Sequence, residues 1–123
     1  MLAAAGAEIV GTIVALHGNP TWSWLWRSLL AETVRRARRG MAAWRVVAPD
    51  QRGYGRTTGW SADYDGDLSP VRPLNLVRDS LGLVRALGHE AAAGLVGHDF
   101  GSPVAAWCAL LRPDVFRSVA LMS

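Results

Sequence analysis

The sequence predicts an α/β fold in which a parallel sheet carries helices on both faces. Apolar segments without polar alternation are typical of strands buried on both sides, and they occur at residues 10–16, 45–49, 91–96 and 118–122. Helical patterns separate these segments at residues 24–39, 74–87 and 104–111. Because about four strands alternate with three main helices, right-handed crossovers should place the strands side by side in one parallel sheet.

The composition limits the classes of protein that the chain can represent. It has 123 residues, of which 50% are hydrophobic, so we expect a single domain with a hydrophobic core. All thirteen basic residues are arginines, and the net charge is +3. The basic cluster at residues 35–39 falls at the end of a predicted helix, where cations are favourable, and no recognition motif accompanies it. We therefore expect no nucleic-acid partner.

The sequence also carries information on location. No apolar stretch reaches the length of a membrane span, and no cationic segment precedes an apolar one near the amino terminus. Cys108 is the single cysteine, which excludes an internal disulfide and fits a reducing compartment. These features predict a cytoplasmic protein with no membrane partner.

The first predicted strand, residues 10–16, runs directly into the turn His17-Gly18-Asn19-Pro20. The proline of this turn is a candidate for a cis peptide bond. Thr21 or Ser23 is expected to cap the helix that follows, and Gly40 is expected to end it.

The second predicted strand, residues 45–49, ends in the glycine-rich loop Asp50-Gln51-Arg52-Gly53-Tyr54-Gly55-Arg56-Thr57. We expect Asp50 and Arg52 to hold this loop together rather than to perform chemistry. The loop stays polar through residue 70 and includes aspartates at positions 63, 65 and 67. They lack the glycine and the closing glutamate of a calcium loop, so no metal site is predicted.

The stretch Gly97-His98-Asp99-Phe100-Gly101 lies between the third predicted strand and the last predicted helix. Glycines two positions before and two after Asp99 allow a very tight strand-to-helix turn, because side chains there would crowd the neighbouring backbone. Asp99 should then project beyond the carboxyl end of the strand, just ahead of the helix. The alternative is a purely structural turn in which Asp99 caps that helix.

A carboxylate at the tip of such a turn has a defined chemistry. Asp99 is ionised at neutral pH without the help of a base, and the positive end of the helix dipole favours its charge. Carboxylates attack saturated carbon that carries a leaving group, and the product is an ester on the enzyme. Hydrolysis of that ester needs a second group to activate water. The turn therefore predicts a two-step hydrolysis at an sp3 carbon.

The turn after the first strand is expected to meet Asp99, because sites in open α/β sheets form beyond the carboxyl ends of the strands. If the first and third strands are neighbours, the backbone N–H groups of Asn19 and Phe100 converge and form an oxyanion hole. Trp22 and Tyr54 are candidates for lining the substrate pocket, and core packing is the alternative for Tyr54.

The three histidines are poor candidates for the base that would activate water. His17 precedes its turn and is expected to bond to nearby loop backbone. His98 adjoins Asp99, so the two side chains should diverge, and His89 should lie at the end of a helix. No cofactor is implied by these residues.

In combination, these motifs resemble the α/β-hydrolase superfamily, and within it the epoxide hydrolases and haloalkane dehalogenases. The motifs at residues 17–20, 50–57 and 97–101 carry the resemblance, which covers about residues 11–123. It implies a partial α/β-hydrolase core with Asp99 as the nucleophile and the backbones of Asn19 and Phe100 as the oxyanion hole. The implied substrate is a small apolar epoxide or halide.

The leaving group separates these two families. In dehalogenases, the asparagine after His-Gly and a tryptophan after the nucleophile donate side-chain N–H bonds to the departing halide. Asn19 matches this pattern, but the phenyl ring of Phe100 has no N–H to donate. The Arg-Gly-Tyr-Gly sequence at residues 52–55 is more like that of epoxide hydrolases. The resemblance therefore favours epoxide hydrolysis through an alkyl-enzyme ester, with haloalkane dehalogenation as the alternative.

Members of these families also carry a histidine base, its acidic partner and a helical cap, all of which would lie beyond Ser123. Residues 1–123 are therefore expected to form a single, incomplete hydrolase core that cannot complete the reaction alone. Two further alternatives are a non-catalytic binding module on the same fold and ester hydrolysis, which normally requires a serine in place of Asp99. Uncovered strands at both edges of the sheet predict self-association.

Overall fold

The computed structural model describes residues 7–60, 63 and 65–123. A four-stranded sheet with the strand order β2-β1-β3-β4 forms its centre. The strands are β1 (Ile9–Leu16), β2 (Ala43–Val47), β3 (Gly94–His98) and β4 (Val119–Met122). All three neighbouring pairs are parallel. The predicted fold class is confirmed, and the first strand lies beside the third, as the site prediction requires.

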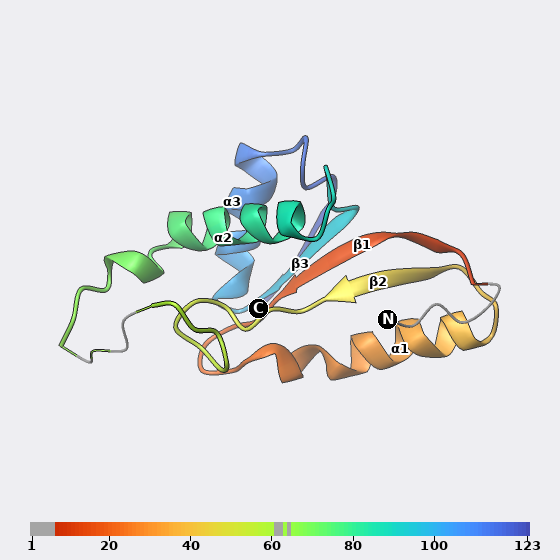
Figure 1. The fold of residues 1–123 in the computed structure, drawn as a ribbon, viewed down its shortest axis with the longest axis horizontal. Coiled ribbons are helices and arrows are strands. Elements are labelled where there is room, and N and C mark those ends of the chain that lie inside the picture. Colours follow the sequence, from red (N-terminus) through yellow and green to blue (C-terminus); the bar gives the residue numbers. More distant parts are fainter. Residues whose placement is uncertain (1–6, 61–62, 64) are drawn as a thin grey trace.

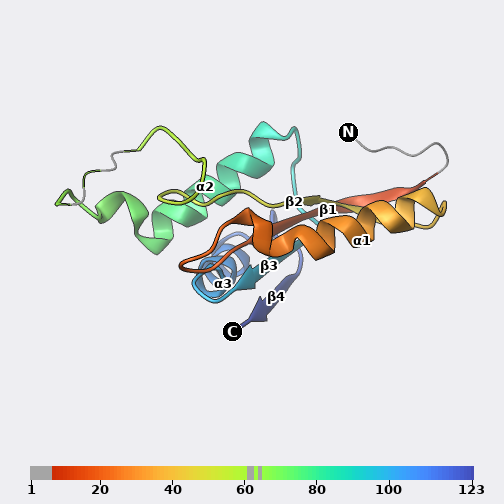
Figure 2. The same ribbon diagram turned by 90° about the horizontal axis from the view of Figure 1, so that it is seen from below.

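Helices cover both faces of this sheet (Figure 1). The helix α1 (Arg27–Arg38) lies on one face, beside β2. On the other face, α2 (Pro73–Ala86) and α3 (Gly101–Leu111) pack against each other, and α3 also packs on β3. Figure 2 views the sheet from the face that α1 covers, with β4 and the carboxyl terminus at one edge of the sheet. The described helices include none with the length and apolar character that a membrane crossing requires.

The core lies between the sheet and the pair α2 and α3. Val14 and Leu16 of β1 and Leu95 of β3 are buried there, because the central strands have neighbours on both sides and a helix layer above. In α2, buried apolar residues recur at helical spacing and face the same layer. Cys108 of α3 completes the contact, and burial raises the pKa of its thiol to about 11. The thiol is therefore protonated at neutral pH and acts as a small apolar side chain.

The helix predicted for residues 24–39 differs from the observed one at its start. A 3₁₀ turn (Ser23–Trp26) comes first, and α1 begins only at Arg27. The predicted capping by Thr21 or Ser23 is wrong. The Thr21 hydroxyl donates to the carbonyl of Gly18, and the Ser23 N–H donates to the carboxylate of Asp50. The Thr21 hydroxyl thus bonds back to the preceding turn, and neither side chain caps the helix. The first turn closes on itself with a bond from the Leu25 N–H to the Trp22 carbonyl.

The third strand also differs from its prediction, because β3 extends through His98. Gly97 pairs with Leu16 on one side and with Leu121 on the other. The strand ladder thus reaches into the glycine turn, and the connection to α3 is shorter than the sequence suggested. The predicted loop over residues 50–70 includes residues 61, 62 and 64, which lie outside the described residues.

Candidate active site

The candidate nucleophile lies on a turn of only two residues. Between the end of β3 and the start of α3, the chain has just Asp99 and Phe100. Asp99 has a φ of 51°, in the left-handed region that non-glycine residues rarely adopt. Such a conformation costs about 1–3 kcal/mol and is found mainly where the surrounding structure enforces it. The side chain of Asp99 is exposed beyond the carboxyl end of the strand.

The two glycines that flank Asp99 make this turn possible. A β-carbon at Gly97 would overlap the carbonyl group of Gly101, and one at Gly101 would overlap the carbonyls of Leu16 and His17. Neither position has room for a methyl group, because the neighbouring atoms belong to backbone. The prediction of a glycine-dependent turn is therefore confirmed. The second of these close approaches also brings the start of α3 against the end of β1.

The carboxylate of Asp99 lies against the turn that follows β1. The backbone N–H of Asn19 donates to Asp99 Oδ1 at 2.9 Å. Hydrogen bonds from the N–H groups of Asn19 and then Phe100, with a smaller contribution from the charge of His98, hold the pKa of Asp99 below its usual value. The carboxylate is therefore ionised at neutral pH. Both of the predicted oxyanion donors point to one carboxylate, and their catalytic role stays a prediction.

Sequence reasoning missed Ser102, which ties the turn to the edge strand. Its hydroxyl lies 2.9 Å from the carbonyl oxygen of Gly97 and 2.7 Å from that of Met122. The N–H of Asp99 donates to the same Met122 carbonyl at 2.9 Å. A serine near the start of a helix often bonds to local backbone, so its position in the sequence gave no signal of this link.

His17 holds the two loops of the site together rather than acting as a base. It is fully buried, and its Nε2 accepts the backbone N–H of Gln51 at 2.9 Å. The ring proton must therefore be on Nδ1, which donates to the Gly18 carbonyl at 2.8 Å. The Gln51 side chain returns a bond from Nε2 to the His17 carbonyl. The expectation that His17 bonds to loop backbone is confirmed.

The other two histidines lie apart from this network. His89 follows α2 and places its Nε2 3.2 Å from the Thr12 hydroxyl and 3.4 Å from Arg45 Nη1. Thr12 lies in the first half of β1 and Arg45 in the middle of β2, away from Asp99 at the carboxyl ends of the strands. His98 Nδ1 is buried and has no hydrogen-bond partner within the described part of the chain.

Asp50 and Arg52 fix the glycine-rich loop after β2, as expected, but each also ties it to another segment of the chain. Asp50 accepts the N–H of Ser23 at 2.8 Å and the N–H of Arg56 at 3.0 Å. It therefore joins the loop after β1 to the loop after β2. Arg52 forms two bonds to Asp79 of α2, at 2.9 and 2.6 Å. Asp50 and Arg52 thus serve the framework of the site.

The two predicted pocket-lining residues have different surroundings. The rings of Tyr54 and His17 form a T-shaped contact, with the ring centroids 5.0 Å apart and the ring planes at 80°. Burial raises the pKa of Tyr54, and the negative charge of Asp99 raises it further. Its phenol is therefore protonated and close enough to Asp99 to sense its charge. Trp22 is 42% exposed, and the guanidinium of Arg56 lies 5.5 Å from its ring centroid. Trp22 lines a hollow of about 530 Å³ that does not include Asp99.

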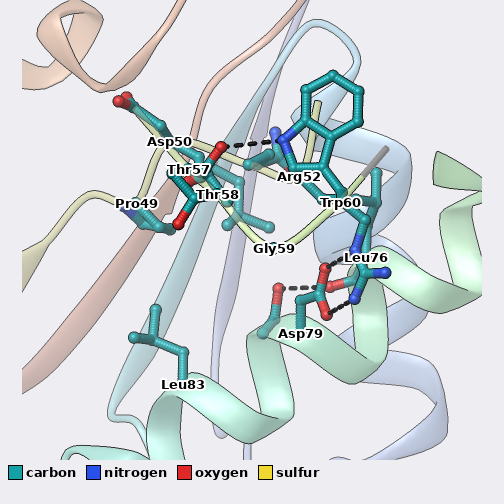
Figure 3. A pocket seen from close by; sticks show the side chains of 13 residues that line it. Pro49, Asp50, Arg52, Thr57, Thr58, Gly59, Trp60, Leu76, Asp79 and Leu83 are labelled. Carbon is teal, nitrogen blue, oxygen red and sulfur yellow. Dashed lines mark hydrogen bonds and ion pairs between the residues drawn. The ribbon is translucent and has the colours of Figure 1, made fainter. Parts of the chain in front are cut away.

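A second pocket, of about 270 Å³, lies between the loop after β2 and α2 (Figure 3). Its walls include the Arg52–Asp79 pair, Leu76 and Leu83. The indole of Trp60 lies across from them and donates to the Thr57 carbonyl at 2.9 Å (Figure 3). The lining does not include Asp99, Asn19 or Phe100, so this pocket is separate from the candidate nucleophile.

A strained, exposed carboxylate between strand and helix, facing a main-chain turn, is the arrangement that the sequence motifs suggested. Comparison with known families agrees, because the model of a family described as "alpha/beta hydrolase fold" matches residues 11–123. The chain belongs to the alpha/beta hydrolase fold family.

Relatives of this chain carry the names of two kinds of enzyme. It is 37% identical over 107 residues to "Epoxide hydrolase" of Caballeronia sordidicola, covering 87% of this chain and 29% of that protein. It is 40% identical over 102 residues to "Epoxide hydrolase B" of Mycobacterium tuberculosis, covering 83% of this chain and 25% of that protein. With "Haloalkane dehalogenase 2" of Mycobacterium bovis the identity is 34%, covering 89% of this chain and 33% of that protein.

Solved structures place the chain in the same group. "Epoxide hydrolase from an endophytic Streptomyces" matches with a TM-score of 0.79 and 39% identity, covering 94% of this chain and 31% of that one. The chain thus spans about a third or less of the length of these relatives. The similarity supports the hydrolase core described above.

Proposed function

We propose that this hydrolase chain carries the nucleophile and the oxyanion hole of an epoxide hydrolase. The observation that carries the proposal is the 2.9 Å hydrogen bond from the Asn19 N–H to Asp99 Oδ1, made at the tip of an exposed turn. One carboxylate oxygen is held by the main chain, which leaves the other to attack. The N–H of Phe100 supports the same carboxylate.

In the proposed first step, an oxygen of Asp99 forms a bond to an epoxide carbon while the ring C–O bond breaks. The released alkoxide takes a proton from water, and a hydroxyalkyl ester of Asp99 remains. Oδ1 becomes the carbonyl oxygen of this ester and stays near the N–H groups of Asn19 and Phe100. When water attacks the ester, negative charge develops on that oxygen, and each such donor is worth roughly 3 kcal/mol.

Epoxide opening is favoured over halide displacement by the residue after the nucleophile. The oxygen of an epoxide leaves as an alkoxide that water or an acid can protonate, whereas a halide ion needs hydrogen-bond donors. Phe100 offers only a phenyl ring there, which agrees with the names of the epoxide hydrolase relatives. Asn19 and the dehalogenase relative favour haloalkane dehalogenation as the second candidate.

We further propose that residues 1–123 form a single, incomplete hydrolase core domain of a longer protein, in a reducing compartment such as the cytoplasm. The relatives are about three to four times as long as the matched segment, and the buried thiol of Cys108 has no second cysteine to pair with. His17 already uses both ring nitrogens, and His89 lies elsewhere. The ester of Asp99 should therefore form on this chain and hydrolyse slowly.

Mass spectrometry of the chain after incubation with styrene oxide tests this function. We expect a stable adduct with the mass of one epoxide molecule, located on Asp99 by peptide sequencing. Butyl bromide, used at the same concentration, should label more slowly because its leaving group lacks a second donor. Labelling by the bromide alone would favour the dehalogenase, and the absence of an Asp99 adduct with either reagent would favour a non-catalytic module.

We also propose that the chain self-associates through its edge strands. In β4, Val119 is 41% exposed, Leu121 51% and Met122 42%, and apolar edges with unpaired backbone groups favour pairing between chains. Size-exclusion chromatography with light scattering should give a mass above the 13.2 kDa of one chain. Leu121→Arg should shift the mass toward the monomer, whereas Leu74→Arg, an exposed position on α2, should not. A monomeric parent chain would contradict the proposal.

A further inference from the structure

The carbonyl oxygen of Gly18 is the most heavily hydrogen-bonded atom of the turn after β1. His17 Nδ1 donates to it at 2.8 Å, the Thr21 N–H at 3.2 Å and the Thr21 hydroxyl at 3.1 Å. Two of the three donors thus belong to Thr21. A carbonyl with three donors cannot rotate without breaking all of them.

This carbonyl shares a peptide group with the N–H of Asn19. The peptide group is planar, and the one cis bond of this turn is the next one along, between Asn19 and Pro20. The Gly18 carbonyl and the Asn19 N–H therefore point in opposite directions. Donors that fix the carbonyl on one side set the direction of the N–H on the other, where it reaches Asp99 Oδ1 at 2.9 Å. Bonds to the carbonyl also polarise the amide and strengthen its N–H as a donor.

The donors differ in what else they do. His17 is fully buried and also holds Gln51, so its replacement would disturb both loops. Thr21 is only partly buried, and its hydroxyl has the Gly18 carbonyl as its hydrogen-bond partner in the described structure. The hydroxyl can therefore be removed by the near-isosteric change to valine without emptying a core position.

We propose that Thr21 is a positioning residue for the oxyanion hole, because its hydroxyl holds the Gly18–Asn19 peptide so that the Asn19 N–H points at Asp99. This role rests on the proposed function of Asp99, but its geometry is independent of turnover. Thr21 does not touch the reacting atoms. It acts through the peptide between Gly18 and Asn19, and a weaker bond from Asn19 should leave both the carboxylate and the later oxyanion less stabilised.

The test compares Thr21→Val with Thr21→Ser in the full chain by NMR. Loss of one hydrogen bond, about 1 kcal/mol, should make the Asn19 amide exchange with solvent roughly fivefold faster in Thr21→Val. The pKa of Asp99, followed by carbon-detected titration, should rise toward its ordinary value in that variant. Thr21→Ser keeps the hydroxyl and should restore both quantities. His98 and Tyr54, the other groups that interact with Asp99, are unchanged in every variant.

Thr33→Val is the matched control. The hydroxyl of Thr33 also bonds to backbone, at Trp44, but Thr33 lies on α1 beside β2. Because the Thr33 hydroxyl exchanges two hydrogen bonds with Trp44, this change should cost at least as much stability as Thr21→Val. It should leave the exchange rate of the Asn19 amide and the pKa of Asp99 unaltered. The positioning role would be overturned if Thr21→Val changed neither the exchange rate of the Asn19 amide nor the pKa of Asp99. It would also be overturned if Thr33→Val changed both quantities as much as Thr21→Val. Failure of the unsubstituted chain to form an Asp99 ester would instead reject the proposed function, and the NMR comparison would still report on the peptide.

Discussion

Asp99→Asn should abolish formation of the ester with styrene oxide, lowering the rate of adduct formation by roughly 10³-fold or more. The amide keeps the size of the side chain but has no negative charge, so it cannot attack an epoxide carbon as a carboxylate does. The hydrogen bond from the Asn19 N–H has an oxygen acceptor in both forms, which should preserve the turn. The measurement is the intact mass of the protein over time, at equal reagent concentration.

Asp114→Asn is the control for general carboxylate reactivity. Asp114 is exposed and pairs with Arg112, and hydrogen bonding to that arginine holds its pKa at about 2, so it too is an ionised carboxylate. Its replacement should leave the rate of adduct formation unchanged. If Asp99→Asn reacted as fast as the parent chain, or if peptide sequencing found the adduct on Asp114, Asp99 would not be the nucleophile.

Gly101→Ala should destabilise the fold by about 3 kcal/mol, the upper part of the range for overpacking. The added methyl group would overlap the carbonyls of Leu16 and His17, which belong to the central strand and its turn. Relief requires α3 to move away from β1, and this movement also carries Asp99 away from Asn19. Urea denaturation followed by circular dichroism measures the loss of stability, and the Asp99 adduct rate should fall in the same variant.

Gly82→Ala is the same type of substitution, but it should stabilise the fold. Gly82 lies on the exposed side of α2, and a β-carbon there meets no heavy atom within 4 Å. Alanine is a better helix former, so the free energy of unfolding should rise by about 1 kcal/mol. Comparable stabilities of the two alanine variants would show that the close approach at Gly101 does not constrain the turn.

The fold class could be predicted from general rules, and so could the meeting of Asn19 with Asp99 on the condition that β1 and β3 are neighbours, which the structure supplies. Unalternating apolar runs indicate buried parallel strands, and the carboxyl ends of neighbouring parallel strands meet at one edge of the sheet. The glycines at positions 97 and 101 identified the tight turn, because the lack of a β-carbon can be read from the residue type without knowledge of any distant contact. These predictions depended on residue types and order alone.

The hydroxyl contacts of the site could not be predicted, because short polar side chains accept many local partners. Thr21 and Ser102 both occupy positions where a helix cap is common, yet their hydroxyls bond to the Gly18 carbonyl and to the Met122 carbonyl. The Thr21 hydroxyl bonds back to its own turn instead of forward to a helix, and the Ser102 bond depends on the tertiary placement of β4. The 3₁₀ turn before α1 was not predicted either, and its first N–H, from Ser23, is bound by Asp50 of a distant loop.

The Ser102 hydroxyl and the Asp99 N–H both bond to the Met122 carbonyl, and this double link affects where a tag can be attached to the protein. A purification tag, fluorophore or surface tether attached behind β4 would act on the same carbonyl that holds the turn at Asp99. Attachment ahead of Ile9 avoids this strain, because β1 has eight residues and separates that position from the bend by roughly 25 Å. The two chain ends are thus mechanically unequal.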